Sequence, residues 1–211
     1  MAEFASVEKK HNDRIAELAG GDIDTFNICI MLKNMSDSEP LDTLYRLGLR
    51  GRNISELYKM LGNGYSIEED VRILDYVLGW LGKIGDQHIK ELNELCKVDG
   101  KLDLKSFIAV AAMALYSAEE NSAPLNVELD SSIAAMKALN IKGSEIFYRF
   151  VKYYKDSFEE ILRPYFEADA SMSQAYNNST DDQKGIIFIK AFFQELNEIE
   201  KEKEDVYQYI R

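Results

Sequence analysis

The side chains that most often carry catalysis are scarce in this sequence of 211 residues. Its two histidines are His11, in a charged opening segment, and His88, at a position that continues an apolar helical stripe and therefore suits packing. Glu8 and His11 form one Glu-x-x-His pair, but a carboxylate-bridged di-iron site needs two such pairs and two further glutamates. With no Gly-x-Ser-x-Gly motif and no glycine-rich phosphate loop, the sequence predicts a protein that is not an enzyme.

The sequence also gives no support for a metal site or for redox chemistry. Cys29 and Cys96 are isolated in the sequence, so we interpret both as reduced packing residues. The segment DGKLDLKSF resembles the second half of a calcium-binding EF-hand loop, but the positions that should bear ligands hold Leu95, Lys97 and Ser106. The alternative interpretation of this segment is a loop with a capping aspartate. No metal and no cofactor is therefore predicted.

Charge and hydropathy restrict the possible partners. The 37 acidic and 25 basic residues give a formal net charge of -12, which opposes binding to nucleic acid or an anionic membrane because phosphate neutralisation requires clustered cations. A basic or peptide partner is favoured instead. The longest apolar run, FIAVAAMAL, is too short to span a bilayer, and no secretory leader opens the sequence. We therefore expect a soluble, cytoplasmic protein.

The strongest helical pattern, over 144–166, places an apolar stripe beside a row of polar and basic side chains. The stripe residues recur at helical spacing and are Phe147, Phe150, Val151, Tyr154, Phe158, Ile161 and Leu162. Tyr148, Arg149, Lys152 and Lys155 lie outside this stripe. The helix therefore offers a core surface together with an aromatic and cationic edge that could meet a partner.

Helical patterns also dominate the rest of the chain, which has only three prolines, so the predicted fold class is all-α. The predicted helices are 2–18, 26–35, 41–49, 53–61, one helix of about thirty residues that follows the Ser66 cap and reaches Leu95, 102–118, 131–140, a helix capped by Ser144 that ends or kinks near Leu162, and a last helix from Ile186. The segment 173–183 is predicted to be a polar loop, and the charged tail to continue as solvated helix.

The order and lengths of these helices, with the residues on them, resemble the 14-3-3 family of phosphopeptide-binding adaptors. Three blocks carry the resemblance: RNISELYKML followed by SIEEDVRILDYVLGWLG, then SEIFYRFVKYYKDSFEEI, then KGIIFIKAFFQEL. The resemblance implies a single domain over 1–211, an array of antiparallel helices forming a cup-shaped bundle. Within it, 1–40 would be divergent N-terminal helices and 198–211 a charged tail. The family's sixth helix would be truncated and its last helix missing.

The resemblance also implies where a ligand would bind. The family holds phosphate with two arginines, a lysine and a tyrosine, because guanidinium groups form charge-assisted, often bidentate bonds to it. An ungapped match places Lys152 at the lysine position of the fifth helix. It places Leu78 and Ile84 at the lysine and arginine positions of the third helix, with Lys83 adjacent to Ile84.

Other positions of the family's pocket are also changed. The arginine-tyrosine pair of the fifth helix falls at Ser157 and Phe158, and Lys155 could replace it only with a two-residue deletion that scrambles the buried stripe. The peptide-clamping asparagine of the seventh helix falls at Ile189, next to Lys190. The predicted peptide-binding residues are therefore Lys152, Lys83, Lys155, Ile189 and Lys190. Ordinary solvated lysines are the alternative interpretation of these cations.

Two classes of function follow. The first is a phosphoserine- or phosphothreonine-peptide-binding adaptor of 14-3-3 type with a degenerate phosphate pocket, which binds phosphorylated or acidic segments of other proteins weakly or with altered recognition. The second is an acidic α-helical scaffold or regulatory decoy that does not bind phosphopeptides. A homodimer is expected from the family resemblance and from the apolar short helices before Gly62, which would otherwise leave an exposed patch.

Overall fold

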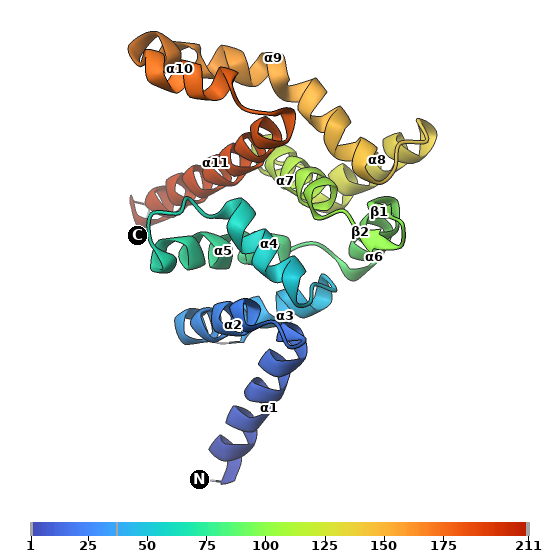
Figure 1. The fold of residues 1–211 in the computed structure, drawn as a ribbon, viewed down its shortest axis with the longest axis vertical. Helices are drawn as coiled ribbons and strands as arrows, with labels where there is room; N and C mark the ends of the chain where they lie inside the picture. The colour runs from blue at the N-terminus through green and yellow to red at the C-terminus, as the bar shows by residue number, and fades with distance from the viewer. Residues whose placement is uncertain (1, 37, 210–211) are drawn as a thin grey trace. The chain divides into compact units, whose positions relative to one another are not determined.

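The computed structural model describes the backbone of residues 2–36 and 38–209 and the side chains of 11–36 and 38–203. The described residues form eleven α-helices and one two-stranded hairpin, and 80% of the structure is helical (Figure 1). The all-α fold class predicted from the sequence is confirmed. Among the described residues, no helix combines the length and the apolar character that crossing a bilayer requires.

The chain divides into two compact units, Met1–Ile89 and Lys90–Arg211. In each unit, helices pack both on sequence neighbours and on helices further along the chain, such as Glu39–Arg46 on Ile67–Leu81 in the first unit and Leu104–Glu120 on Asp181–Tyr209 in the second. The single domain over 1–211 and its cup shape stay predictions.

The first unit contains five helices and the start of a sixth. They are α1 (Ala2–Ala19), α2 (Ile23–Ser36), α3 (Glu39–Arg46), α4 (Arg52–Leu61), α5 (Ile67–Leu81) and the first residues of α6 (Asp86–Leu95). Seven aliphatic residues in the segments of the short helices before Gly62 are buried, with 0–1% of their surface exposed: Leu41, Leu44, Leu47, Leu49, Ile54, Leu57 and Leu61. They form no exposed patch, so they give no argument for a dimer.

The predicted helix of about thirty residues after Ser66 is wrong, because the chain leaves the helix between α5 and α6. Gly82 ends α5, and a Cβ atom there would lie 3.0 Å from Thr43 Oγ1, so only a small residue fits against α3. The Arg46 guanidinium donates hydrogen bonds to the carbonyls of Gly82, at 3.0 Å, and Ile84, at 2.7 Å. These carbonyls lie past the last turn of α5, and Arg46 satisfies them in place of a continuing helix.

The start of α5 agrees with the sequence prediction, since the Ser66 hydroxyl accepts a hydrogen bond from the Glu69 amide at 3.1 Å. A second carboxylate orders the turn before it. Asp70 has 7% of its surface exposed and accepts hydrogen bonds from the amides of Asn63, at 2.6 Å, and Gly64, at 3.1 Å. Asp70 therefore holds the glycine-rich turn between α4 and α5.

Replacing Asp70 with alanine should lower the free energy of unfolding by about 1–2 kcal/mol, because two amides lose a charged acceptor but lie where water can partly replace it. Urea denaturation followed by circular dichroism measures the change. The Glu68→Ala variant is the matched control, because Glu68 is an exposed carboxylate in the same helical turn. Equal stability losses in the two variants would contradict the role assigned to Asp70.

The second unit contains the remaining elements of the chain. After the end of α6 they are β1 (Lys97–Val98), β2 (Lys101–Leu102), α7 (Leu104–Glu120), α8 (Leu125–Ala138), α9 (Ser144–Ala168), α10 (Ala170–Asn177) and α11 (Asp181–Tyr209). The hairpin was not predicted. It turns through Asp99 and Gly100, whose positive φ angles of 50° and 76° suit an Asp-Gly turn.

Two expectations about α9 and its surroundings are wrong. The helix continues through Pro164 to Ala168, so of the two expected outcomes near Leu162, an end or a kink, the end is wrong. Much of the segment predicted as a polar loop forms α10, whose Tyr176 ring lies 5.2 Å from that of Phe166. Packing of α10 on the end of α9 supports the helix beyond the proline. The start of α9 also differs, because Gly143 occupies the cap position and Ser144 is the first helical residue.

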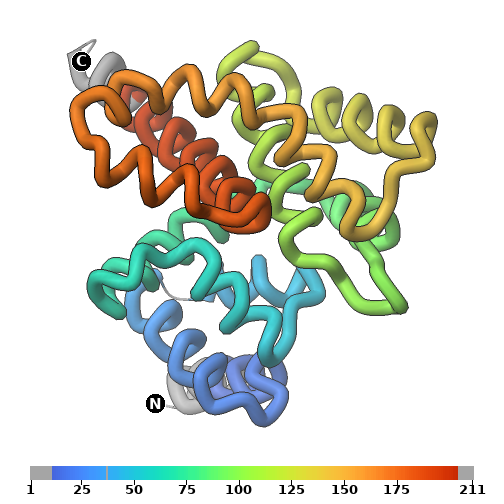
Figure 2. The backbone as a smooth tube through the Cα atoms, turned by 45° about the horizontal axis from the view of Figure 1, so that its top comes forward, coloured from blue at the N-terminus to red at the C-terminus, as the bar shows by residue number. Residues whose placement is uncertain are grey.

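An aromatic core joins α9 to α11, which lie side by side in Figure 2. The rings of Phe158 and Phe188 stack with centroids 4.4 Å apart, and Phe150 meets Phe192 at 6.0 Å. Gly185 lets the helices approach this closely, because a Cβ atom there would lie 2.3 Å from Phe147 Cζ. The apolar stripe predicted on α9 is thus largely the face that packs on α11. Its members Ile161 and Leu162 differ, since Ile161 has 61% of its surface exposed and Leu162 is half-buried.

Candidate functional site

A groove of about 800 Å³ lies between α7, α8 and α9, entirely within the second unit. Most of the side chains that line it are apolar or aromatic: Val110 and Met113 from α7, Ala135 and Met136 from α8, Leu139 and Ile141 from the segment after α8, and Ile146, Phe150, Tyr153 and Tyr154 from α9. Ligand sites are commonly hollows of this size with mainly apolar walls and a few polar groups. We call it the α7–α9 groove.

Helical periodicity explains the wall that α9 contributes. Ile146, Arg149, Phe150 and Tyr153 follow the i, i+3, i+4, i+7 spacing that places side chains on one face of a helix. Ile146 and Phe150 are buried and form part of the floor, whereas Tyr153 has 77% of its surface exposed. Leu139, which follows the last residue of α8, is 70% exposed. Large apolar side chains therefore stand at both rims.

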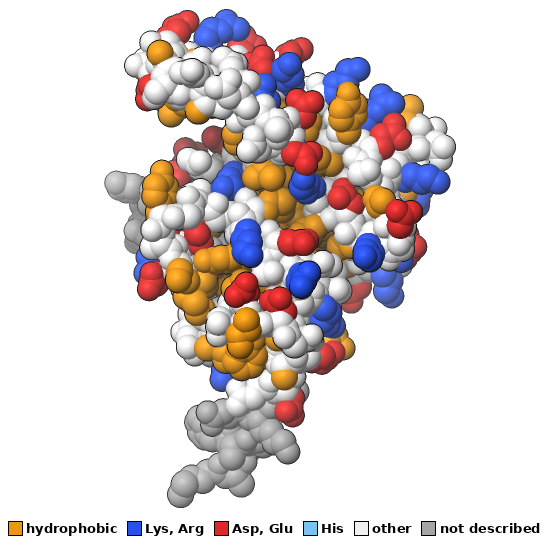
Figure 3. Space-filling model, viewed as in Figure 1, with side chains coloured by type: hydrophobic (Ala, Val, Ile, Leu, Met, Phe, Trp, Pro, Cys, Tyr) orange, Lys and Arg blue, Asp and Glu red, His pale blue; other side chains and the backbone are white. Residues whose placement is uncertain are grey.

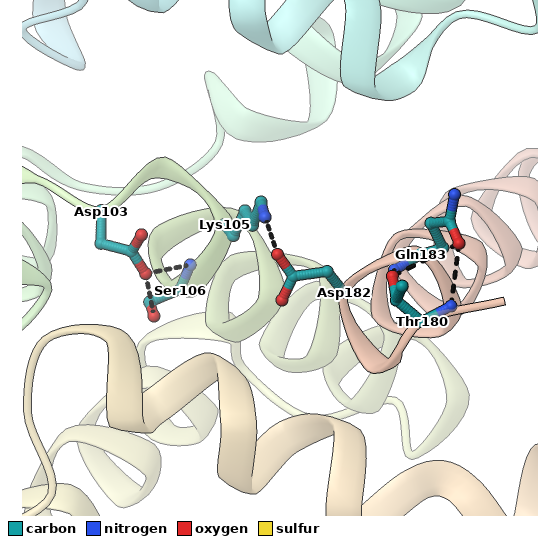
Figure 4. A network of polar contacts seen from close by, with 6 residues as sticks. All are labelled: Asp103, Lys105, Ser106, Thr180, Asp182 and Gln183. Carbon is teal, nitrogen blue, oxygen red and sulfur yellow. Dashed lines mark hydrogen bonds and ion pairs between the residues drawn. The ribbon is translucent and has the colours of Figure 1, made fainter.

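Polar contacts hold the start of α9 against α7, and both helices form walls of the groove. The Ser106 hydroxyl accepts a hydrogen bond from the Phe147 amide at 3.1 Å and lies 2.9 Å from the carbonyl oxygen of Gly143. Ser106 belongs to the first turn of α7, where Asp103 accepts a hydrogen bond from its amide at 3.2 Å (Figure 4). This one buried serine thus fixes the beginning of α9 against α7.

Further contacts support the surrounding elements. Lys105 of α7 forms an ion pair with Asp182 at the start of α11 (Figure 4). Thr180 and Gln183 cap the same helix reciprocally, with the Thr180 amide donating to Gln183 Oε1 at 2.8 Å. The opposite wall is tied by Lys137 of α8, which pairs with Glu91 of α6 at 2.6 Å. The groove is therefore bounded by anchored helices.

The charged residues that line the groove are both basic. They are Arg149 and Lys152, and no acidic residue of the described chain lines it. Arg149 pairs with Glu145 one turn earlier, at 3.2 Å, and both side chains are largely exposed. Lys152 is exposed and has no hydrogen bond or ion pair among the described residues. Figure 3 shows basic side chains near hydrophobic groups in the part of the view where α9 lies.

Tyr154 and two serines supply the groove with neutral hydroxyl groups. Burial, with smaller contributions from Tyr153 and Glu120, raises the pKa of the Tyr154 phenol to about 12. Tyr154 therefore remains protonated near neutral pH. Ser131 and Ser132 add hydroxyl groups on the α8 side. The groove thus combines an apolar interior with a short basic rim on α9, in a chain whose net charge is -12.

The structure places the five predicted peptide-binding residues in different environments. Lys152 lines the α7–α9 groove, whereas Lys155 is exposed on the same helix outside it. Ile189 is fully buried, so its side chain offers no surface to a peptide. Lys190 is half-buried and makes contacts of its own. Lys83 belongs to the first unit, where its Nζ lies 3.4 Å from the centre of the Trp80 ring. Only Lys152 is thus found at the groove.

The positions that correspond to the family's phosphate pocket are mostly in the core. Leu78 and Ile84 have 0% of their surface exposed, and Phe158 has 8%. Ser157 is exposed on α9. These four positions supply no cation, so any anion at the groove would be held by Lys152 and Arg149.

Most of the groove's residues were missed from the sequence. The cationic edge of α9 was recognised, including Arg149, but Met113, Met136, Leu139 and Tyr153 were not expected to line a ligand site. The buried residues of α8 are Leu129, Ile133 and Met136, on one helical face, whereas Leu139 follows the last residue of the helix and is 70% exposed. In the sequence, an exposed apolar residue such as Leu139 cannot be told from an ordinary surface leucine, because its neighbours in space are not known.

Other reactive side chains lie in surroundings of a different kind. His11 lines a polar hollow of about 500 Å³ with Arg14 and carboxylates that include Asp42. No group of three metal-binding side chains occurs within the described residues, and the side chain of Glu8, paired with His11 in the sequence, lies outside them. Burial raises the pKa of the Cys29 and Cys96 thiols to about 12, so both are protonated.

Comparison of the chain with protein-family models, with curated proteins and with solved structures found no match. The 14-3-3 resemblance therefore rests on the three sequence blocks alone.

Proposed function

We propose that this chain is a non-catalytic interaction protein that binds acidic or phosphorylated segments of other proteins at the α7–α9 groove. One observation carries the proposal: Lys152 is exposed at an apolar groove and has no partner among the described residues. Arg149 stands one turn away and is paired only with an exposed carboxylate. Two cations on a groove wall favour an anionic group in the ligand.

The more specific form of the proposal is an adaptor of 14-3-3 type with a degenerate phosphate pocket. The three sequence blocks support it, as does the position of Lys152. The buried Leu78, Ile84 and Phe158 argue for weak phosphate binding, because they supply no guanidinium groups. In this form of the proposal the protein acts in the cytoplasm as a homodimer, which rests on the family resemblance.

Fluorescence anisotropy with a labelled phosphoserine peptide, its glutamate version and its unphosphorylated version tests the proposal. The peptide carries leucine beside the phosphoserine. Binding of the two anionic peptides should exceed that of the neutral one, and Lys152→Glu should weaken it roughly tenfold by replacing attraction with repulsion. The measurement is repeated at higher salt, where the difference should shrink.

Lys155→Glu is the matched control, because it changes the net charge equally on the same helix without touching the groove. Its affinity should stay close to that of the unmodified protein. Equal losses in both variants would reduce the effect to net charge, and unchanged binding in Lys152→Glu would remove Lys152 from the site.

The second candidate is an acidic α-helical scaffold or regulatory decoy without phosphopeptide binding. The charge of -12 and the loss of cations at the family's pocket positions favour it. If none of the three peptides binds, this second function becomes the better supported one.

A further inference from the structure

We propose that the segment bound in the α7–α9 groove is an amphipathic α-helix of the partner, whose apolar face lies in the groove and whose acidic residues face Lys152 and Arg149. This inference rests on the proposed function and specifies its ligand. It differs from the extended phosphopeptide that the family resemblance implies.

The exposed rims indicate a ligand larger than the groove itself. Tyr153 of α9 and Leu139, which follows α8, both line the groove and have 77% and 70% of their surface exposed. A small molecule inside the groove would leave most of these two side chains in water. A helix about 10 Å wide with its side chains would fill the groove and cover both rims at once.

The chemistry of the walls favours a helix over an extended strand. An extended segment presents unpaired backbone N–H and C=O groups, which lose free energy when they are buried without partners. The α7–α9 groove has an apolar interior, with serine hydroxyls only on α8 and the cations on α9. A helix satisfies its own backbone hydrogen bonds and presents side chains alone, so it suits such a groove.

Charge sets the orientation of the bound helix about its own axis. Arg149 and Lys152 both belong to α9, whereas Ser131 and Ser132 line the α8 side. A partner helix with acidic residues along one edge of its apolar stripe would place that edge against α9. Its carboxylates can also replace Glu145 as the partner of Arg149, since that pair is exposed and readily exchanged.

The test uses a labelled helical peptide of about 18 residues, long enough to fold, with leucine at i, i+3, i+4 and i+7 and glutamate along one edge. A second peptide carries proline at a central, solvent-facing position, and a third has lysine in place of the glutamates. Anisotropy should show binding of the first peptide. The proline peptide should bind at least about tenfold more weakly, because proline breaks the helix without removing any groove contact.

Two protein variants test the location. Ala135→Trp fills the groove from the exposed side of α8 and should weaken binding of the helical peptide at least about tenfold. Ala134→Trp places the same ring at the neighbouring exposed position, which does not line the groove, and should leave binding unchanged. Lys152→Glu should bind the lysine peptide better than the glutamate peptide, reversing the preference of the unmodified protein.

The outcomes separate this inference from the proposed function. If the proline peptide or the extended phosphoserine peptide binds as tightly as the helical one, and Lys152→Glu weakens both, the helix inference is overturned while the proposed function stands. If Ala134→Trp and Ala135→Trp act alike, the location is overturned. If no peptide binds, the inference falls together with the proposed function.

Discussion

Replacing Phe188 with alanine should lower the free energy of unfolding of the second unit by about 3–5 kcal/mol, the largest effect expected of any single change considered. Phe188 has 0% of its surface exposed and stacks on Phe158 with an interplanar angle of 17°. It also meets the edge of Phe150 at 6.5 Å. Truncation would therefore open a cavity among rings of two helices and remove their mutual contacts.

Urea denaturation followed by far-ultraviolet circular dichroism measures this loss. Tyr148→Ala serves as the control, because Tyr148 is 60% exposed on α9 and its removal should change stability by less than about 1 kcal/mol. A Phe188→Ala protein as stable as the Tyr148→Ala protein would contradict the assigned core.

The same experiment tests the single-domain prediction. The only tryptophan in the sequence is Trp80, which is buried in the first unit, so tryptophan fluorescence reports on that unit. If the chain is one cooperative domain, Phe188→Ala should shift the fluorescence transition together with the circular dichroism transition. If the units unfold separately, the fluorescence transition should stay in place.

Replacing Ser106 with alanine should lower the free energy of unfolding by about 1–3 kcal/mol, because the change leaves the buried Phe147 amide without its acceptor. The Phe147 amide would lose its acceptor and the Gly143 carbonyl a donor within reach. Water cannot readily enter to replace the hydroxyl, since Ser106 has 0% of its surface exposed. The loss is measured by urea denaturation.

The control for this change is Ser144→Ala, which removes an exposed serine hydroxyl from the first turn of α9. Because that hydroxyl has no hydrogen bond among the described residues, stability should change by less than about 1 kcal/mol. A loss below 1 kcal/mol in Ser106→Ala as well would show that Ser106 does not hold α9 against α7 as we infer.

Local chemistry in the sequence was sufficient to predict much of the fold. The Ser66 cap and the apolar periodicity of α9 depend on residues a few positions apart, and the structure has the expected helices there. The break after Leu81 depends instead on Thr43 and Arg46, which are distant in sequence. The apolar pattern continues across that break because Ile84 is buried too, so periodicity alone could not reveal it.

The α7–α9 groove was predictable only in part for the same reason. The cations of α9 stand outside its apolar stripe, which a single helix can reveal, and Lys152 does lie at a hollow. Which apolar residues face that hollow depends on how α8 and α9 pack on α7, which the periodicity of a single helix does not reveal. Likewise, Ile189 and Lys190 are adjacent in sequence but differ in burial, since Ile189 packs into the core.

Gly185 lies outside the groove but determines how closely α11 packs against α9, one of the helices that form the groove. The helix α9 contacts α11 at Gly185, where no side chain separates the two helices. Another part of the surface of α9 lines the groove. A Cβ atom at 185 would lie 2.3 Å from Phe147 Cζ and 2.6 Å from Val151 Cγ2, so a larger residue there must displace these side chains or α9 itself. We expect substitution at this position to change the packing of α9 beside the groove while every residue that lines the groove stays the same.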